Sequence, residues 1–449
     1  MCDNTYQSEK EKLYICGDFE KVMPEIEKAA KNGNSRDRYL MFLSYKMGAG
    51  VSIDNQKAKE WIQDAQKYKD PLLMMEYAYN FCDNDEDEEK IIHPYVNSLK
   101  MMADLGDVLA QFEYGAYVYS RKGDVKKGIK YVNDSYDQGF IISGIWLAGL
   151  YLNGTDIDKN IDKAFDIYKI GCEKGIPVAL NQMAWMMWNE IISKENYNKN
   201  YFELWKEAAI KGYDVAEFST GYLYYNGDGI KQDYYEAVNW FQKASNHDYN
   251  MSFYYLGLCY LEGKGVSEKN VDKAIELFEE SGKLGYIDAY LKLGDLYFKD
   301  INRISDKFDF EKATKWYNIA ADMGSVQALT KIGQCYYESG DRQNYKKAFE
   351  YFKMAAEKDD ADGLYYLWNC YVLGKGISKT DNDMTKQLLE KASEKGNAEA
   401  QLLRGQDICF HYKTRQEFDY GLSLLKSAME QGNKQAKIEF EHYSRYFTN

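Results

Sequence analysis

The chain repeats one pattern of residues along most of its length. Residues 255–278 read YLGLCYLEGKGVSEKNVDKAIELF, and residues 219–241 carry the same skeleton as STGYLYYNGDGIKQDYYEAVNWF. Self-similarity at a period of roughly 36 residues is typical of repeat architectures, in which one supersecondary unit is stacked many times. Because each unit buries its apolar face against its neighbours, this repetition constrains the fold more than any single motif.

The first half of each unit predicts an amphipathic helix. It aligns an apolar residue, a glycine and then a tyrosine three positions on, as in Leu256, Gly257 and Tyr260. This spacing places the residues on one helical face. Comparable triples are Thr220, Gly221, Tyr224; Leu293, Gly294, Tyr297; Ile332, Gly333, Tyr336; Leu147, Ala148, Tyr151; and Leu367, Trp368, Tyr371.

A glycine loop and a second helix follow. Pairs such as Gly263 and Gly265 suit a helix end that requires positive φ. The second helix aligns Lys273, Ala274 and Phe278 with Lys312, Ala313, Tyr317 and with Lys347, Ala348, Phe352. It ends on another glycine, at Gly33, Gly106, Gly139, Gly175, Gly212, Gly285, Gly324, Gly396 or Gly432. Pro71 and Pro177 open two of the first helices, where no N–H donor is needed.

These columns resemble the Sel-1-like repeat (SLR) family, relatives of the tetratricopeptide repeat, from about Asp37 to Gly432. We expect an all-α fold, an α-solenoid superhelix of about eleven helix-turn-helix repeats of roughly 36 residues. The resemblance implies a right-handed superhelix whose first helices line the inner surface. The expected domains are residues 1–36, an N-terminal cap with an unpaired helix; residues 37–433, the solenoid; and residues 434–449, a C-terminal capping helix.

Three units depart from the repeat pattern. The second, fifth and eighth replace the glycine loop with DNDEDEEKIIHP (83–94), NEIISKENYNKN (189–200) and KDINRISDKFD (299–309). We expect irregular loops there, and the acidic run of the second unit is interpreted as a solvated loop because it lacks the ligand spacing of a calcium-binding loop.

Composition limits the classes of partner that the protein can bind and the cellular compartment in which we expect it. The formal net charge of −14 disfavours binding to nucleic acid. We found neither a signal peptide nor an apolar run long enough to span a membrane, so no membrane insertion is expected. The eight cysteines occur singly, without C-x-x-C pairs, and together these features favour a cytoplasmic protein.

No motif in the sequence indicates catalysis. GKGISKT (374–380) lacks the glycine that precedes Lys-Ser/Thr in a phosphate-binding loop. The histidines, His93, His247, His411 and His442, show no metal-ligand spacing. We therefore expect no enzymatic activity, no cofactor and no metal.

The residues of the first helices that lie outside the packing columns are polar and aromatic, a composition that suits a protein or peptide segment. We predict a non-catalytic protein-protein interaction scaffold or adaptor that binds on its concave face. The alternative is a small-molecule or glycan sensor, or an enzyme of cell-wall-related chemistry, and homo-oligomer formation through the terminal repeats is a further expectation. The predicted binding residues are Asn181, Gln182, Trp185, Trp188, Tyr222, Tyr225, Asn226, Tyr254, Tyr255, Gln334, Tyr337, Tyr365, Tyr366 and Asn369.

Overall fold

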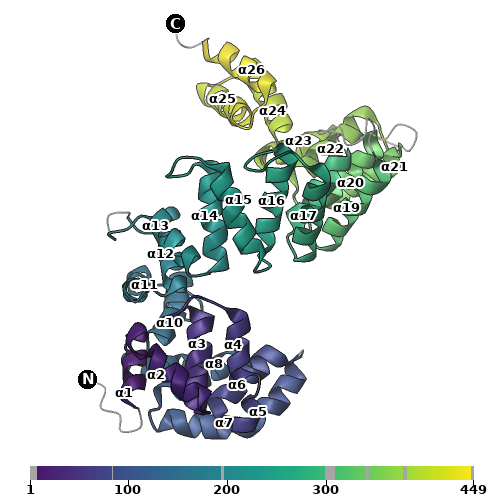
Figure 1. Ribbon diagram of the computed structural model, residues 1–449. Helices are drawn as coiled ribbons and strands as arrows, with labels where there is room; N and C mark the ends of the chain where they lie inside the picture. Colours follow the sequence, from purple (N-terminus) through teal and green to yellow (C-terminus); the bar gives the residue numbers. More distant parts are fainter. Residues whose placement is uncertain are drawn as a thin grey trace. The chain divides into compact units, whose positions relative to one another are not determined.

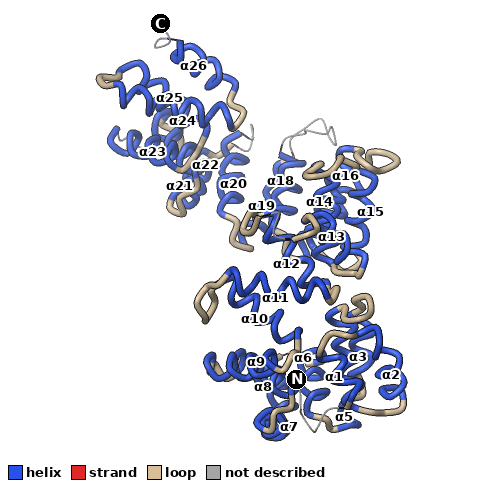
Figure 2. Tube along the Cα trace, turned by 90° about the vertical axis from the view of Figure 1, so that its left-hand side faces the viewer, coloured by secondary structure: helices blue, strands red, loops and turns tan. Residues whose placement is uncertain are grey.

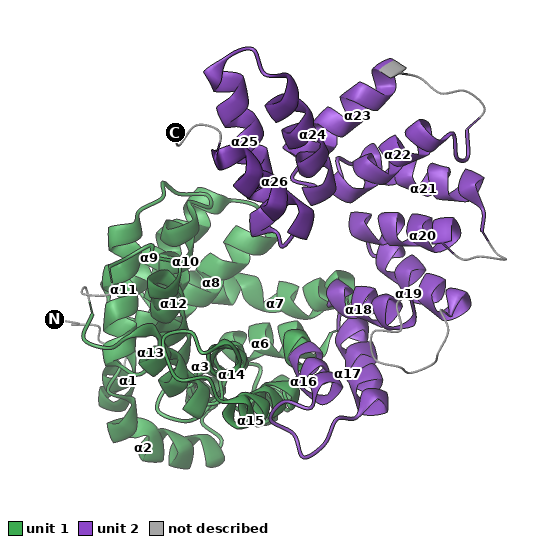
Figure 3. Ribbon diagram, turned by 90° about the horizontal axis from the view of Figure 1, so that it is seen from above, with its two compact units in different colours: residues 1–252 green, residues 253–449 purple. Residues whose placement is uncertain are grey.

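The fold is built from α-helices. The computed structural model describes residues 8–82, 84–193, 197–298, 309–338, 343–377 and 382–445, and within these ranges it contains no β-strand (Figure 2). This confirms the predicted all-α solenoid class. The chain forms two compact units, unit 1 of residues 1–252 and unit 2 of residues 253–449 (Figure 3). Each unit is described by itself below.

Successive helices pair as hairpins in both units (Figure 1). We call the first helix of each hairpin its A helix and the second its B helix. Unit 1 contains α1 (Glu9–Ile15), α2 (Phe19–Lys31), α3 (Ser35–Met47), α4 (Asn55–Ile62), α5 (Ala65–Tyr68), α6 (Pro71–Phe81), α7 (Asp85–Asp104), α8 (Val108–Arg121), α9 (Val125–Asp137), α10 (Ile141–Asn153), α11 (Ile161–Glu173), α12 (Pro177–Trp188), α13 (Tyr201–Ile210), α14 (Asp214–Asn226) and α15 (Tyr234–Ser245). Unit 2 contains most of α16 (Asn250–Glu262), then α17 (Val271–Lys283), α18 (Ile287–Phe298), α19 (Phe310–Asp322), α20 (Val326–Glu338), α21 (Tyr345–Ala356), α22 (Ala361–Leu373), α23 (Asn382–Glu394), α24 (Ala398–His411), α25 (Arg415–Glu430) and α26 (Lys434–Ser444).

The repeated glycines end helices as predicted. Gly48 (φ 69°) closes α3 and Gly227 (φ 73°) closes α14, both in the left-handed region that favours glycine. Pro71 and Pro177 lie in the first turns of α6 and α12. The B helices begin with a further signal, an Asp or Asn whose side-chain oxygen accepts the N–H of the residue three positions on. These N-cap residues are Asp54, Asn160, Asp233, Asn270, Asp309 and Asn344.

The glycine column of the A helices allows close packing against the aromatic column of the B helices. A Cβ atom at Gly257 would lie 2.6 Å from Cε1 of Phe278, and one at Gly333 would lie 2.5 Å from Cε1 of Phe352. The corresponding contact of Gly294 is with Tyr317. Real Cβ atoms do not approach a ring this closely, so the two helices of a hairpin can pack in this way only when the A helix lacks a side chain at that position.

Two segments differ from the sequence-based expectation. The acidic run was expected in an irregular loop, but it forms the first turns of α7, so that interpretation was wrong. Asn84 caps the helix by accepting the N–H of Asp87, and carboxylates are stabilised near a helix N-terminus by the peptide dipoles. Over the described residues that precede α3, from 8 to 34, the chain forms two helices, α1 and α2, where the pattern had indicated one. Residues 194–196 and 299–308 of the other two irregular segments lie outside the described residues.

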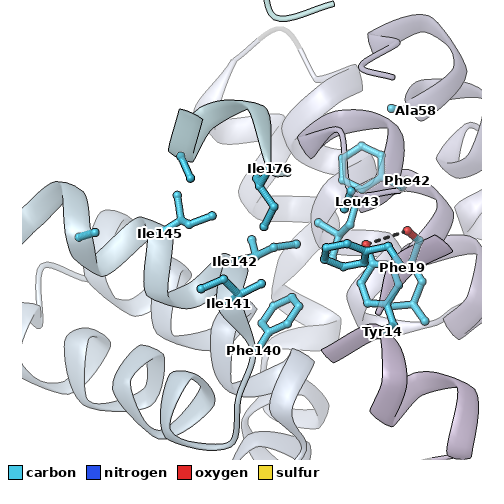
Figure 4. Packing of buried hydrophobic residues seen from close by; sticks show 14 of the residues in the cluster. Tyr14, Phe19, Phe42, Leu43, Ala58, Phe140, Ile141, Ile142, Ile145 and Ile176 are labelled. Atoms are coloured by element: carbon cyan, nitrogen blue, oxygen red, sulfur yellow. Dashed lines mark hydrogen bonds between the residues drawn. The ribbon is translucent and has the colours of Figure 1, made fainter. Parts of the chain in front are cut away.

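In unit 1, the later hairpins contact residues near the start of the chain. The N–H of Ile53, in the loop after α3, donates to the carbonyl oxygen of Lys211 after α13, at 2.8 Å. Nζ of Lys174 lies 3.6 Å from Oδ1 of Asp18 at the start of α2. Figure 4 shows Phe140 and Ile142 of the α10 region in the same buried cluster as residues from the N-terminal helices. The A helices of unit 1 therefore surround a common interior.

Candidate functional site

A cavity of about 480 Å³ lies among the A helices of unit 1. We call it the inner cavity. Its lining comes from α3, α6, α8, α10 and α12, together with Tyr168 of α11. Most of the wall is apolar: Figure 4 shows three of its residues, Leu43, Ile142 and Ile145. Cavities of this volume, enclosed by apolar groups with a few polar ones, are typical of sites that hold small organic groups.

Two buried carboxyl groups, Glu76 of α6 and Glu113 of α8, line the inner cavity. The residues are only 5% and 3% exposed. Nζ of Lys46 lies 3.1 Å from Oε2 of Glu76, and Nδ2 of Asn80 donates to the same oxygen at 3.2 Å. Glu113 has a different environment, because its Oε1 accepts the hydroxyl of Tyr39 and, among the described residues, its Oε2 accepts no hydrogen bond.

The surroundings of Glu113 disfavour its charged form. Burial raises the pKa of the Glu113 carboxyl to about 8, and the negative charge of Glu76 acts in the same direction. The hydrogen bond from Tyr39 and the charge of Lys46 oppose the shift but are smaller. Burial also raises the pKa of Tyr79, whose side chain lines the same cavity. The inner cavity therefore holds a carboxyl group whose ionisation would require a further positive charge beside it.

The sequence-predicted residues of unit 1 are not gathered into one site. Gln182 lines the inner cavity. Asn181 is buried, and its Oδ1 accepts the indole N–H of Trp205 at 2.9 Å. Trp185 and Trp188 are 39% and 38% exposed at the end of α12. The polar group of Asn181 is thus already used within the chain, whereas the two tryptophans offer surface.

The remaining predicted residues of unit 1 lie on α14, and one of them, Tyr222, contacts Trp188. Its indole N–H donates to Oδ2 of Asp228 at 2.7 Å, and its ring lies 6.5 Å from that of Tyr222, centroid to centroid. Tyr225 packs edge-on against Tyr234 at 5.4 Å. Asn226 donates from Nδ2 to the carbonyl oxygen of Tyr222 at 3.2 Å. These contacts fix the orientation of the aromatic rings at the end of α14.

In unit 2 the structure brings three predicted residues together. Gln334 of α20 and both Tyr365 and Tyr366 of α22 line a pocket of about 290 Å³, which we call the unit 2 pocket. Asp362 and Glu399 also line it, which gives the pocket an acidic rim. Tyr366 stacks on Phe352 with ring centroids 5.0 Å apart, so this tyrosine is held rigidly by the core.

The other predicted residues of unit 2 contact side chains of their own or the next hairpin. Tyr254 contacts the rings of Tyr255 and Tyr286 at 5.5 and 5.1 Å. Tyr337 lies under Nζ of Lys375, 4.4 Å from the ring centroid. Asn369 is half-buried on α22 and does not line the unit 2 pocket.

A larger cavity of about 590 Å³ lies among the loops of unit 1, and it has a different character. It is lined by loop and helix-end residues that include Asp18, Lys21, Lys174 and Lys211. Its lysines already have partners, since Lys21 and Lys174 pair with Asp18 and Lys211 donates to the carbonyl oxygen of Gly175. These groups hold the first and later hairpins of unit 1 together.

Sequence reasoning missed Glu76, Glu113 and Lys46. All three lie on A helices, in the otherwise apolar or aromatic segments MFLSYKM, PLLMMEYAY and VLAQFEYGAY. A carboxylate inside such a segment was the available signal, because a buried charge requires a partner. The stacking that brings α3, α6 and α8 around one space could not be read from the repeat pattern.

Within the described ranges, the side chains form no cluster of three or more His, Cys, Asp or Glu residues that could hold a metal ion. Over the same residues, no helix combines the length and the apolar character needed to cross a membrane.

Comparison with known proteins identifies the repeat. The family model described as Sel1 repeat matches residues 38–65, 145–176, 214–249, 254–286, 287–325, 326–360 and 361–397. Chitin synthase regulatory factor 3 of Schizosaccharomyces pombe is 25% identical over 45% of this chain and 22% of its own length. The ERAD-associated E3 ubiquitin-protein ligase component HRD3B of Arabidopsis thaliana is 27% identical over 48% of this chain and 36% of its own length. The DAP3-binding cell death enhancer 1 of Rattus norvegicus is 27% identical over 38% and 32%.

This chain therefore matches only about a third or less of the length of these curated relatives. Among solved structures, a protective antigen of uropathogenic Escherichia coli with an SLR fold superimposes with a TM-score of 0.55 and 21% identity, over 95% of this chain and 91% of the antigen. That similarity supports the fold alone.

Proposed function

Because the chain belongs to the Sel1 repeat family, we propose that it is a non-catalytic scaffold or adaptor that binds a segment of another protein on the inner surfaces of its A helices. The names of its relatives describe a regulator of chitin synthase, a component of a ubiquitin ligase and a DAP3-binding protein. Each of these names refers to the regulation or binding of another protein or to membership of a protein complex. The names belong to the relatives, and their functions are not transferred to this chain.

One structural observation supports the inner surface in particular. The inner cavity is lined mainly by A helices, and three predicted binding residues on A helices line the unit 2 pocket. Tyrosine and tryptophan provide large contact areas with few rotatable bonds, and such residues dominate the binding energy at protein interfaces. Stacked repeats of this kind form extended concave surfaces that serve for binding.

The proposal can be tested with the full chain immobilised on resin and a lysate of the organism that encodes it, with bound proteins quantified by mass spectrometry. Trp185→Ala in unit 1 and Tyr365→Ala in unit 2 remove aromatic surface from A helices. Tyr235→Ala removes an aromatic side chain that is 74% exposed on the B helix α15, and it serves as the matched control. We expect specific partners that one or both A-helix variants bind at least about tenfold more weakly, as for an interface hot spot, and that Tyr235→Ala binds as well as wild type.

Partners bound equally by all variants would contradict the use of the inner surface. A sugar or nucleotide that raises the melting temperature in a saturable way, with no protein bound specifically, would favour the small-molecule function. We keep the cytoplasmic location and self-association through the terminal repeats as parts of the proposal; light scattering on the purified chain tests the second.

A further inference from the structure

The inner cavity contains more acidic groups than basic ones. Two carboxyl groups, Glu76 and Glu113, face a single cation, Lys46. The side chain of Lys46 is 42% exposed and its ammonium group pairs with Glu76. Glu113, a residue that is 3% exposed, lines the cavity, and the Tyr39 hydroxyl donates to its Oε1. The ionised form of Glu113 is costly in this buried position unless a ligand supplies a positive charge.

The residues that line the inner cavity indicate the chemical character of a ligand that would fit it. Beyond the two carboxyls, the lining is apolar and aromatic, with Phe112 and Trp146 among its residues. A group that fits therefore carries a positive charge at one end and an apolar stem behind it. Lysine and arginine side chains have this construction, since both bury an aliphatic stem while the charged end seeks an anion. An anion would meet two carboxyls, and a purely apolar group would cover the polar carboxyl of Glu113 without pairing with it.

We propose that the inner cavity binds the lysine or arginine side chain of a protein segment that lies along the A helices of unit 1; this deepens the proposed function and rests on it. The cation pairs with Glu113 and its stem packs against Phe112, Trp146 and Ile142. Glu76 remains paired with Lys46. We assign the cation to a protein segment because the cavity is lined by the same A helices that form the proposed binding surface.

A pH dependence follows from the same geometry. The groups that face Glu113 are Tyr39 and Lys46 from α3 and Glu76 and Tyr79 from α6. The lining residues of α10 and α12 carry no charge. The carboxyl of Glu113, with its pKa raised to about 8, must lose its proton when the cation arrives. Binding therefore releases a proton and strengthens as the pH rises toward 8, by about tenfold or more between pH 6.5 and 8.5.

The experiment uses the full chain and blocked peptides as probes. The cationic probes are Ac-Gly-Ser-Leu-Lys-Leu-Ser-Gly-NH₂ and its arginine analogue; the neutral probes carry norleucine or citrulline at the central position. Hexylammonium is the free-amine arm. Isothermal titration calorimetry at pH 6.5 and 8.5, in two buffers of different ionisation heat, gives both affinity and proton release. We expect a cationic peptide to bind at least tenfold more tightly than its neutral analogue and hexylammonium to bind more weakly than the lysine peptide.

Three variants locate the binding. Glu113→Gln keeps an acceptor for Tyr39 while removing the charge, and it is expected to weaken binding at least tenfold and to abolish the proton release. Ile142→Trp fills the cavity without changing its charge and is expected to weaken binding by a similar factor. Glu60→Gln removes one carboxylate from the exposed surface of α4 and is the matched control. It should leave both the peptide affinity and the proton release unchanged.

The proposal is overturned if no cationic peptide binds, if neutral peptides bind as tightly as cationic ones, if hexylammonium binds as tightly as the lysine peptide, or if Glu113→Gln binds like wild type. Partners found in the lysate experiment distinguish the two proposals. If Tyr365→Ala loses those partners while Glu113→Gln and Ile142→Trp bind them fully, the scaffold function stands and the cation site is wrong.

Discussion

The hydroxyl of Tyr39 on α3 donates a hydrogen bond to Oε1 of Glu113 on α8, and both side chains are buried. This contact joins A helices of two different hairpins across the hairpin that contains α6. Glu76 of α6 lies at the same cavity, so three successive A helices of unit 1 contribute to one polar cluster. A polar cluster in a low-dielectric interior has large effects on stability when its protonation changes.

The first prediction concerns pH and Glu113. Burial, with the charge of Glu76, raises the folded-state pKa of Glu113 from 4.5 to about 8. The folded state then holds a proton that the unfolded state has released between these values, so the free energy of unfolding falls as pH rises from about 4.5 to about 8. Glu113→Gln removes this contribution. Its stability relative to wild type should increase by on the order of 2–5 kcal/mol between pH 5 and pH 8.

Urea unfolding at pH 5, 6.5 and 8, followed by circular dichroism and tryptophan fluorescence, checks this difference. Glu60→Gln on the surface of α4 provides the control, and its stability should remain parallel to wild type. Parallel pH profiles of wild type and Glu113→Gln would show that the carboxyl is ionised in the folded protein.

The second prediction concerns Arg36, which ties the N-terminal helix to the solenoid. Its guanidinium donates to Glu11 on α1, with Nε at 2.8 Å, and to Asp107, the N-cap of α8, with Nη1 at 2.7 Å. The side chain of Glu11 is 5% exposed and that of Arg36 is 24% exposed. Arg36→Ala leaves two carboxylates without their cation, so we expect a loss of about 2–4 kcal/mol and faster amide exchange in α1.

Hydrogen exchange by mass spectrometry separates this local effect from general destabilisation, because α1 should respond before the helices of unit 2. Lys31→Ala removes a cation that is 64% exposed in its pair with Glu27, and it should change stability by less than about 0.5 kcal/mol. Equal effects of the two substitutions would mean that the Arg36 contacts contribute no more than a surface pair.

Much of the fold could be predicted because its determinants are local. The glycines that end helices, such as Gly48 and Gly227, adopt the positive φ that the pattern required. The prolines lie where a missing N–H is harmless. The acidic segment after Asn84 was predicted to be a loop because it has no apolar periodicity at its start. It forms the beginning of α7 instead, where negative charges near the helix N-terminus are favourable. Repeat spacing alone gave no information on this.

The candidate site was predicted less well because it depends on contacts between hairpins. The A-helix reasoning identified Gln182 at the inner cavity and Tyr365 and Tyr366 at the unit 2 pocket. It also included Asn181, whose hydrogen bond with Trp205 joins α12 to α13. The stacking of the hairpins decides which polar residues contact other residues of the chain and which face open space. The residue spacing within a single repeat does not encode this stacking.

The third prediction concerns the N-cap column of the B helices. Oδ1 of Asn270 accepts the N–H of Lys273 at 2.9 Å at the start of α17. Asn270→Ala leaves that N–H to water and should reduce the stability of unit 2 by about 1 kcal/mol, whereas Asn270→Asp keeps an acceptor and should be nearly neutral. Thermal unfolding of the three proteins tests the order; an alanine variant as stable as the aspartate variant would exclude the cap as a source of stability.

The last prediction tests the reason for the glycine column. A Cβ atom at Gly294 would lie 2.5 Å from Cδ1 of Tyr317, a side chain with 0% exposure whose hydroxyl is fixed by a 2.7 Å hydrogen bond to Asp295. Alanine is favoured over glycine in a helix by about 0.5–1 kcal/mol, but displacing the ring and separating α18 from α19 costs more. We therefore expect Gly294→Ala to lower stability by about 1–3 kcal/mol net. Gly149→Ala is the control, since its only neighbour within 4 Å is the Tyr168 hydroxyl at 3.8 Å.

That control should be stabilised by about 0.5–1 kcal/mol, because only the gain in helix propensity remains. Urea unfolding of both variants gives opposite signs if glycine is required for the approach of the B-helix ring. The same sign for both would mean that the solenoid can adjust its hairpins to a side chain in this column, and that the repeated Leu-Gly pair has a cause other than packing.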